Sequence, residues 1–231
     1  MLHFIYIISL YKIIINCNID LKKRNRREYW KKYTKDKSVR KRLNQKEIQR
    51  KTKIKKWFKE LINTLSCSNC NENQSVCLDF HHVKPKFKQV NQLVRDGYSK
   101  TRIINEIDKC IVLCGNCHRI KHNEISEKNI NSTRKTQSRR KWVIELKELV
   151  GCYNCNIKGY TRIDFHHIQK KKYGINYMVS RFSKTRILTE RKKCIPLCVN
   201  CHRKIHNQII EFKISDTQLA DYWNQINESL D

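Results

Sequence analysis

The chain has 231 residues, of which 39% are hydrophobic and 31% are charged, a balance typical of soluble globular proteins and not of membrane-embedded ones. Its 50 Lys and Arg residues outnumber 21 Asp and Glu, which leaves a formal net charge of +29. A globular protein with this charge repels itself unless a polyanion offsets it, so the composition favours nucleic acid as the partner. The competing interpretation is a solvated, Lys-rich surface of the kind that an AT-rich genome also produces.

The chain begins with an apolar stretch, residues 2–15, which Lys12 interrupts. This stretch has the character of a signal-peptide core or a short anchor. It is too short to span a membrane comfortably, however, and no small-residue cleavage site follows it. We expect a buried or disordered extension, or a start codon assigned too far upstream, and no membrane partner.

A basic segment follows at residues 21–60, where 19 Lys or Arg stand against 4 acidic residues and no Gly or Pro interrupts the chain. This pattern predicts one or two basic helices that lie along a phosphate backbone. Aromatic residues among the charges would pack on the next module or stack on bases. They are Tyr29, Trp30, Tyr33, Trp57 and Phe58. The alternative is a solvated helical face.

Beyond this arm the chain repeats itself. Trp57, Cys67 and Asp79 recur 85 positions later, and after the adjacent histidines the offset falls to 84. A register kept over so many chemically demanding positions predicts two units. Units of this size bury too little apolar surface to be stable alone, and a metal or a disulfide is the usual remedy. We therefore divide the chain into an arm, a first unit, a polar linker, a second unit and a tail, at 1–53, 54–127, 128–138, 139–213 and 214–231.

Each unit carries two Cys-x-x-Cys pairs, which have the spacing of zinc ligands, because each pair places two sulfurs on one side of a short turn. The sequence predicts one structural Zn²⁺ per unit and two per chain; four unrelated buried or redox pairs are the alternative. Thiolates of this kind indicate a reducing compartment, the cytoplasm or nucleus, and not secretion. The ligands are Cys67, Cys70, Cys114 and Cys117, and Cys152, Cys155, Cys198 and Cys201. Cys110 and Cys194 stand alone before apolar runs and are expected to be small buried side chains.

Eight of the nine histidines are not needed for these quartets. The stretches LDFHHV at 78–83 and IDFHHI at 163–168 alternate polar and apolar residues, which predicts strands whose neighbouring side chains point to opposite faces. Strict alternation separates the adjacent histidines unless the strand bends or ends there. His118 and His122 stand four apart, so on a helix both would project from one face and could meet one cation. Such a set, repeated in register, indicates a catalytic site.

The first unit, with LDFHHVKP and then EIDKCIVLCGNCHRIKH, resembles the HNH nucleases of the ββα-metal class, in the subgroup with two flanking Cys-x-x-Cys pairs. The second unit, with IDFHHI and then ERKKCIPLCVNCHRKIH, is similar. The resemblance covers both units, about two thirds of the chain. It implies an α+β fold of two tandem, zinc-stapled ββα-metal modules behind a basic helical arm.

The resemblance also implies roles for individual residues. The second histidine of each pair, His82 or His167, would be the general base. A catalytic divalent cation, Mg²⁺ or another, would bind to the remaining histidines, which are His81, His118 and His122 in the first unit and His166, His202 and His206 in the second. Asn116 and Asn200 would take the supporting place of the Asn in the family name, or would instead cap the helix.

The implied activity is metal-dependent hydrolysis of DNA phosphodiester bonds. A neutral imidazole takes a proton from water, the water attacks phosphorus, and the cation stabilises the phosphate and the departing 3′ oxygen. A helix N-terminus beside the metal adds favourable partial charge. The alternative is a zinc-stabilised regulator that binds nucleic acid without catalysis, and such a protein would have no use for the histidines.

Both units depart from the family pattern after the paired histidines. The first unit has Pro85, as the family usually does, but Lys84 stands where this subgroup often has an acidic residue. The second unit has Gln169 and Lys170 at the corresponding place and lacks the proline. All the presumed chemical residues persist, so we expect activity in both units.

Overall fold

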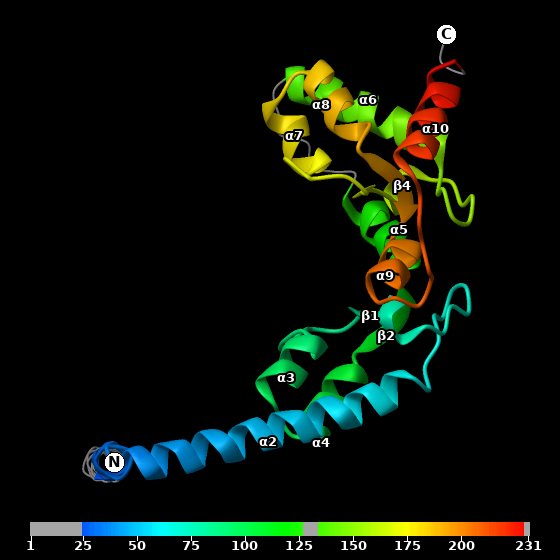
Figure 1. Ribbon diagram of the computed structural model, residues 1–231. Coiled ribbons are helices and arrows are strands. Elements are labelled where there is room, and N and C mark those ends of the chain that lie inside the picture. Colours follow the sequence, from blue (N-terminus) through cyan, green and yellow to red (C-terminus); the bar gives the residue numbers. More distant parts are fainter. Residues whose placement is uncertain (1–24, 127–133, 229–231) are drawn as a thin grey trace, which may run out of the picture.

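The computed structural model describes residues 25–126 and 134–228, and Figure 1 shows their arrangement. The apolar start, Cys17 and about half of the expected linker lie outside the described residues. Within the described ranges, no helix is long and apolar enough to cross a membrane. The fold is α+β, because most elements are helices and two small antiparallel sheets of two strands lie among them.

The basic segment is helical where it is described, at residues 25–33 and in helix α2 (Lys37–Ile62). The Asp36 carboxylate caps α2 by accepting a hydrogen bond from the Ser38 amide. No residue of α2 before Ile54 is buried, whereas Ile54 and Phe58 pack into the core of the first unit. The far half of α2 therefore extends away from the core (Figure 1).

The first unit is built around strands β1 (Leu78–His82) and β2 (Cys110–Cys114), which pair with Leu78 opposite Cys114 and His82 opposite Cys110. The 3-10 turn η1 (Ser75–Cys77) precedes β1, and α5 (Gly115–Ser126) begins directly after β2. Between the strands, α3 (Val90–Asp96) and α4 (Lys100–Ile107) cover the core together with α2.

The second unit repeats this order. Its sheet pairs β3 (Ile163–His167) with β4 (Cys194–Cys198) in the matching register. The other elements are α6 (Arg134–Val150), η2 (Tyr160–Arg162), α7 (Ile175–Arg181), α8 (Lys184–Arg191), α9 (Val199–His206) and α10 (Asp216–Glu228). Helix α10 lies in the expected C-terminal tail, yet its Leu219 and Trp223 are buried in the core. The Trp223 Nε1–H also donates to the Cys194 carbonyl at 2.8 Å.

The last helix of each ββα motif also packs against the other unit. Helix α5 packs against η2 of the second unit, α9 packs against η1 of the first, and the two helices contact each other where the units meet (Figure 1). They approach closely at Gly115, where an added Cβ would lie 2.5 Å from Cγ1 of Val199. Only a residue without a side chain fits at that point.

Candidate functional site

The eight cysteines predicted as zinc ligands gather into two quartets, and in each quartet the four sulfur atoms lie within 4.8 Å of one another. The Sγ atoms of Cys70 and Cys114 are 3.6 Å apart, and those of Cys155 and Cys198 are 3.8 Å apart. Tetrahedral Zn–S bonds of about 2.3 Å place neighbouring sulfurs about 3.8 Å apart, whereas a disulfide bond requires about 2.05 Å. Both quartets therefore fit structural zinc sites.

Each quartet joins a loop turn to the end of a strand. In the first unit the loop turn closes with Asn71 at φ 59°, a left-handed conformation that Asn adopts more readily than most residues. The Cys117 amide, in the first turn of α5, points at Cys114 Sγ at 3.5 Å. Burial alone would raise the pKa of Cys67, but hydrogen bonds from the backbone of Cys114 and Asn69 lower it to about 7, whereas burial raises the pKa of Cys70 and of Cys117.

The histidines expected to bind a catalytic cation form a triad in each unit, with their nitrogen atoms within 4.8 Å of one another. Ring centroids are 4.7 to 5.2 Å apart in the first unit and 4.8 to 4.9 Å apart in the second. One histidine of each triad comes from the first strand of the unit, and two come from the helix that follows the second strand. The triads are His81, His118 and His122, and His166, His202 and His206.

Asp79 determines which nitrogen of His118 is free. Its Oδ2 lies 3.2 Å from His118 Nδ1, and although burial alone would raise the pKa of Asp79, hydrogen bonds from His118 and Arg203 lower it. An ionised carboxylate only accepts hydrogen bonds, so the neutral form of His118 carries its proton on Nδ1 and keeps its lone pair on Nε2.

That free nitrogen has the spacing of a cation ligand. His118 Nε2 lies 3.0 Å from His122 Nε2. Two nitrogens bound to one cation at about 2.1 Å and at right angles are about 3.0 Å apart, so the pair fits neighbouring positions of an octahedral cation. Among the residues that the structure describes, no group forms a hydrogen bond with the buried Nδ1 of His81.

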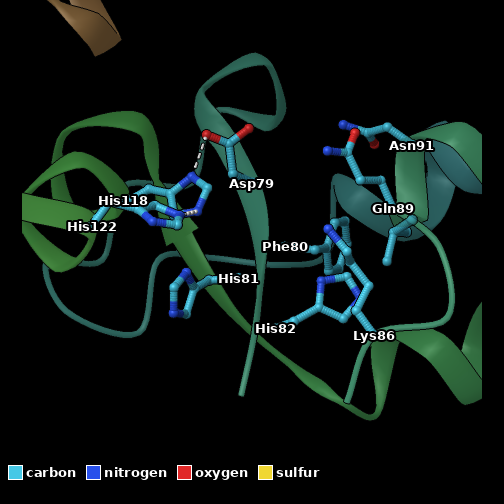
Figure 2. A pocket seen from close by; sticks show the side chains of 10 residues that line it. Asp79, Phe80, His81, His82, Lys86, Gln89, Asn91, His118 and His122 are labelled. Atoms are coloured by element: carbon cyan, nitrogen blue, oxygen red, sulfur yellow. Dashed lines mark hydrogen bonds and ion pairs between the residues drawn. The ribbon is translucent and has the colours of Figure 1, made fainter. Parts of the chain in front are cut away.

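The second histidine of the pair turns away from the triad, as strand alternation predicts. Asp79 and His81 lie towards His118 and His122 of α5, whereas His82 lies on the other side of the strand (Figure 2). On that side Phe80 contacts Phe58 of α2, and His82 contacts Glu106 of α4. Both histidines lie within β1, so the strand does not end between them.

His82 is held by a buried carboxylate. Its Nε2 lies 3.0 Å from Oε1 of Glu106, whose side chain is only 4% exposed. Burial alone would raise the pKa of Glu106, but hydrogen bonds from Lys109 and the Phe87 amide lower it to about 2. Because ionised Glu106 can only accept, a neutral His82 holds its proton on Nε2 and leaves Nδ1 as its basic nitrogen.

The second unit has the same pair. His167 Nε2 lies 3.2 Å from Glu190 Oε1, and hydrogen bonds from Lys193 and the Lys172 amide outweigh burial to lower the pKa of Glu190 to about 2. Burial lowers the pKa of His167, and together with the neighbouring histidines it lowers the pKa of His166 to about 4. Neutral imidazoles are the form that binds cations and accepts protons.

A pocket of about 420 Å³ brings the triad and His82 of the first unit to one space (Figure 2). Asp79, Lys86, Gln89 and Asn91 complete its polar lining. Lys86 is exposed and supplies positive charge at the mouth of the pocket, where an anionic group would enter. The pocket thus combines a carboxylate-held histidine, a candidate cation site and a positively charged side chain.

The two asparagines lie where the units meet. The backbone N–H of Asn116 donates to the side-chain Oδ1 of Asn200 at 3.2 Å, and the backbone N–H of Asn200 donates to the side-chain Oδ1 of Asn116 at 3.4 Å. Each buried side chain therefore caps the first turn of the opposite unit's helix, which is the capping role in a crossed form. Their support of a catalytic cation stays a prediction.

The four residues Glu106, Glu190, Arg119 and Arg203 contact the site and were not singled out from the sequence. Glu106 and Glu190 are 84 positions apart, and so are Arg119 and Arg203. The repeat in the sequence therefore keeps both residue types in register, which is the signal that could have identified them. Cys110 and Cys194, expected as small buried residues, donate their thiols to the carbonyls of Glu106 and Glu190, and Cys194 is fully buried.

Comparisons with protein-family models, curated proteins and solved structures found no match.

Proposed function

We propose that this protein is a metal-dependent DNA endonuclease of the HNH type, with one hydrolytic site in each unit. The observation that carries the proposal is the pairing of a carboxylate-held histidine with a separate histidine triad on one pocket in the first unit. A structural histidine cluster has no need for a second, independently oriented imidazole beside it.

His82 acts as the general base. Its Nδ1 takes a proton from water, the water oxygen forms a bond to phosphorus, and the bond from phosphorus to the 3′ oxygen breaks. Glu106 keeps the ring oriented and stabilises the imidazolium that forms, and the departing oxygen takes a proton from solvent. A divalent cation held by His81, His118 and His122 would neutralise charge on the phosphate and on the leaving oxygen.

Charge and exposed aromatic residues support DNA as the substrate. The chain carries a formal net charge of +29, and the exposed part of α2 contributes a row of Lys and Arg side chains. Tyr29 and Trp30 are 62% and 46% exposed within the same basic segment. Such a combination of cationic and aromatic side chains suits phosphate contact and base stacking.

Supercoiled plasmid tests the proposal. The full chain is incubated with plasmid and Mg²⁺ or Mn²⁺, and EDTA is added to a parallel sample. The matched control is the double variant His82→Ala/His167→Ala, purified in the same way to exclude a contaminating nuclease. We expect cleavage by the wild type that EDTA stops and that the control lacks.

DNA binding without cleavage in either metal would contradict the proposal and identify a zinc-stabilised, non-catalytic regulator. Equal cleavage by the wild type and the control would assign the activity to other residues or to a contaminant.

A further inference from the structure

We infer that Arg119 and Arg203 are positioning residues for the cation site of the opposite unit, so that each site is completed by an arginine from the other repeat. This inference rests on the proposed function, because it concerns the cation sites. It adds to that function a dependence of each site on the neighbouring unit.

Arg203 reaches from α9 of the second unit into the first. Its Nη2 donates to Oδ2 of Asp79 at 2.9 Å, and its Nη1 donates to the Cys77 carbonyl at 3.1 Å. The same Oδ2 accepts from Nδ1 of His118 at 3.2 Å. A continuous path therefore runs from the second unit through Asp79 to a ligand of the first triad.

Arg119 makes the reciprocal contact from α5. Its two terminal nitrogens donate to the two oxygens of Asp164 at 2.9 and 2.7 Å, and Nη1 also lies 3.4 Å from the Thr161 carbonyl. Asp164 in turn lies 3.8 Å from Nδ1 of His202. The second path likewise runs from an arginine through an aspartate to a histidine, but its distance from aspartate to histidine is longer, at 3.8 Å instead of 3.2 Å.

A carboxylate behind a metal-binding imidazole fixes the tautomer and the ring orientation, and loss of such a partner typically lowers metal affinity about 10- to 100-fold. Asp79 and Asp164 are 20% and 17% exposed, so each would otherwise be a largely buried anion free to rotate. A planar guanidinium with two donors on fixed acceptors restrains the carboxylate in a way that a lysine ammonium cannot.

The surrounding contact holds both arginines in place. The close approach of Gly115 to Val199 and the crossed caps of Asn116 and Asn200 join the starts of the two helices. Lys204 adds an ion pair of 2.7 Å with Glu72 of the first unit. Each arginine therefore projects from a helix that is anchored at its beginning to the opposite unit.

Co²⁺ binding to the full-length, zinc-loaded chain tests the inference without relying on cleavage. The variant His202→Ala/His206→Ala leaves only the first triad, and His118→Ala/His122→Ala leaves only the second. Equilibrium dialysis gives the affinity of the remaining triad. The thiolate-to-cobalt charge-transfer band shows whether any Co²⁺ has entered a cysteine quartet.

Arg203→Gln and Arg119→Gln are then introduced into each background. In the chain with only the first triad, we expect Arg203→Gln to weaken Co²⁺ binding about tenfold and Arg119→Gln to change it less than about twofold. In the chain with only the second triad, the order should reverse. Arg203→Lys and Arg119→Lys, which keep the charge, should restore part of the affinity.

Equal losses at both triads for either substitution would show a general effect of the interface and would overturn the inference, as would no loss at all. A loss confined to the triad of the arginine's own unit would also overturn it. If neither triad of the unsubstituted chain binds Co²⁺, the cation sites of the proposed function are absent. If the triads bind Co²⁺ but each arginine does not act selectively on the triad of the opposite unit, this inference is wrong and the proposed function still stands.

Discussion

The first and second units carry the same site residues on the same small sheet, but the second unit has an additional core helix. In the first unit α2 supplies Ile54 and Phe58 from the N-terminal side, and in the second unit α6 supplies Val143 at the position that matches Phe58. In the second unit α10 adds Leu219 and Trp223 from the C-terminal side. The site residues and the surrounding helices therefore keep their register, and the described part of the second unit differs by the addition of α10.

The carboxylates behind the two triads also differ. One oxygen of Asp79, Oδ2, accepts hydrogen bonds from both His118 and Arg203, at 3.2 and 2.9 Å. Asp164 accepts hydrogen bonds from both terminal nitrogens of Arg119, and its Oδ2 lies 3.8 Å from Nδ1 of His202. The first triad is therefore the more tightly oriented, and we expect the first site to be the more active.

The largest effect should come from the zinc quartets. Cys67→Ser removes one ligand from the first quartet, and because a structural zinc contributes on the order of 10 kcal/mol to folding, the first unit should unfold. Cys152→Ser is the matched change in the second unit, where the α10 core should leave more protease-resistant structure. Elemental analysis should show about two zinc ions in the wild type and fewer in each variant. Undiminished zinc in a folded Cys67→Ser chain would contradict the prediction.

The next largest effect concerns the two bases. His82→Ala and His167→Ala should each leave one working site, and the double variant should lose about 10²- to 10⁴-fold in cleavage. Because one site cuts one strand, single variants should convert linear plasmid product into nicked circles. Assays at several protein concentrations separate this result from dimerisation. If His167→Ala changes nothing and His82→Ala abolishes cleavage, the second unit has kept its histidines without their activity.

Glu106→Gln and Glu190→Gln test the carboxylates that hold the bases. An amide can donate to the histidine and so permit the wrong tautomer, so each change should slow its own site at least about tenfold. The pKa of each Glu falls from an ordinary 4.5 to about 2 on folding. Each carboxylate therefore stabilises the fold fully above pH 4.5, and this contribution disappears as the pH falls towards 2.

Circular dichroism between pH 5 and pH 2 checks the sign of that contribution. Either Gln variant should lose less stability across this window than the wild type does. A variant whose acid unfolding matched the wild type would show that the ionised carboxylate is not a source of the pH dependence.

A smaller effect is expected where the units meet. Gly115→Ala places a Cβ against Val199, and such overpacking typically costs about 1–3 kcal/mol of unfolding free energy. Val199→Ala in the same chain should relieve most of this cost, as thermal unfolding of the single and double variants would measure. Gly174→Ala is the matched control, because its Cβ would come no closer than 3.8 Å to any neighbour. Additive single and double effects would argue against a contact at this point.

The smallest effect on chemistry concerns the arm, which belongs to the first unit only. Removal of residues 1–53 should weaken DNA binding and reduce its salt dependence, since each lost phosphate contact lowers the slope of log K against log salt by a little under one. Cleavage at saturating DNA should persist, because Ile54 and Phe58 remain in the chain. A slope that did not change would identify the arm as a solvated extension.

The sequence by itself predicted the close donor pairs within the four metal-type clusters. It did so because their geometry is local: Cys-x-x-Cys brings two sulfurs together within a turn, and His-x-x-x-His brings two imidazoles together on one helical face. The alternation in LDFHHV likewise predicted that His81 and His82 separate across the strand, which the side-chain contacts confirm.

Only the tertiary structure decided which charged residues complete the sites. Arg203 and Asp79 are 124 positions apart, and Glu106 and His82 are 24 apart, so no local periodicity connects them. In a chain with 50 Lys and Arg, one more arginine on a polar helix looks like solvated surface. Its role follows from the docking of α5 and α9 across the two units, because that docking places each guanidinium on a carboxylate of the opposite repeat.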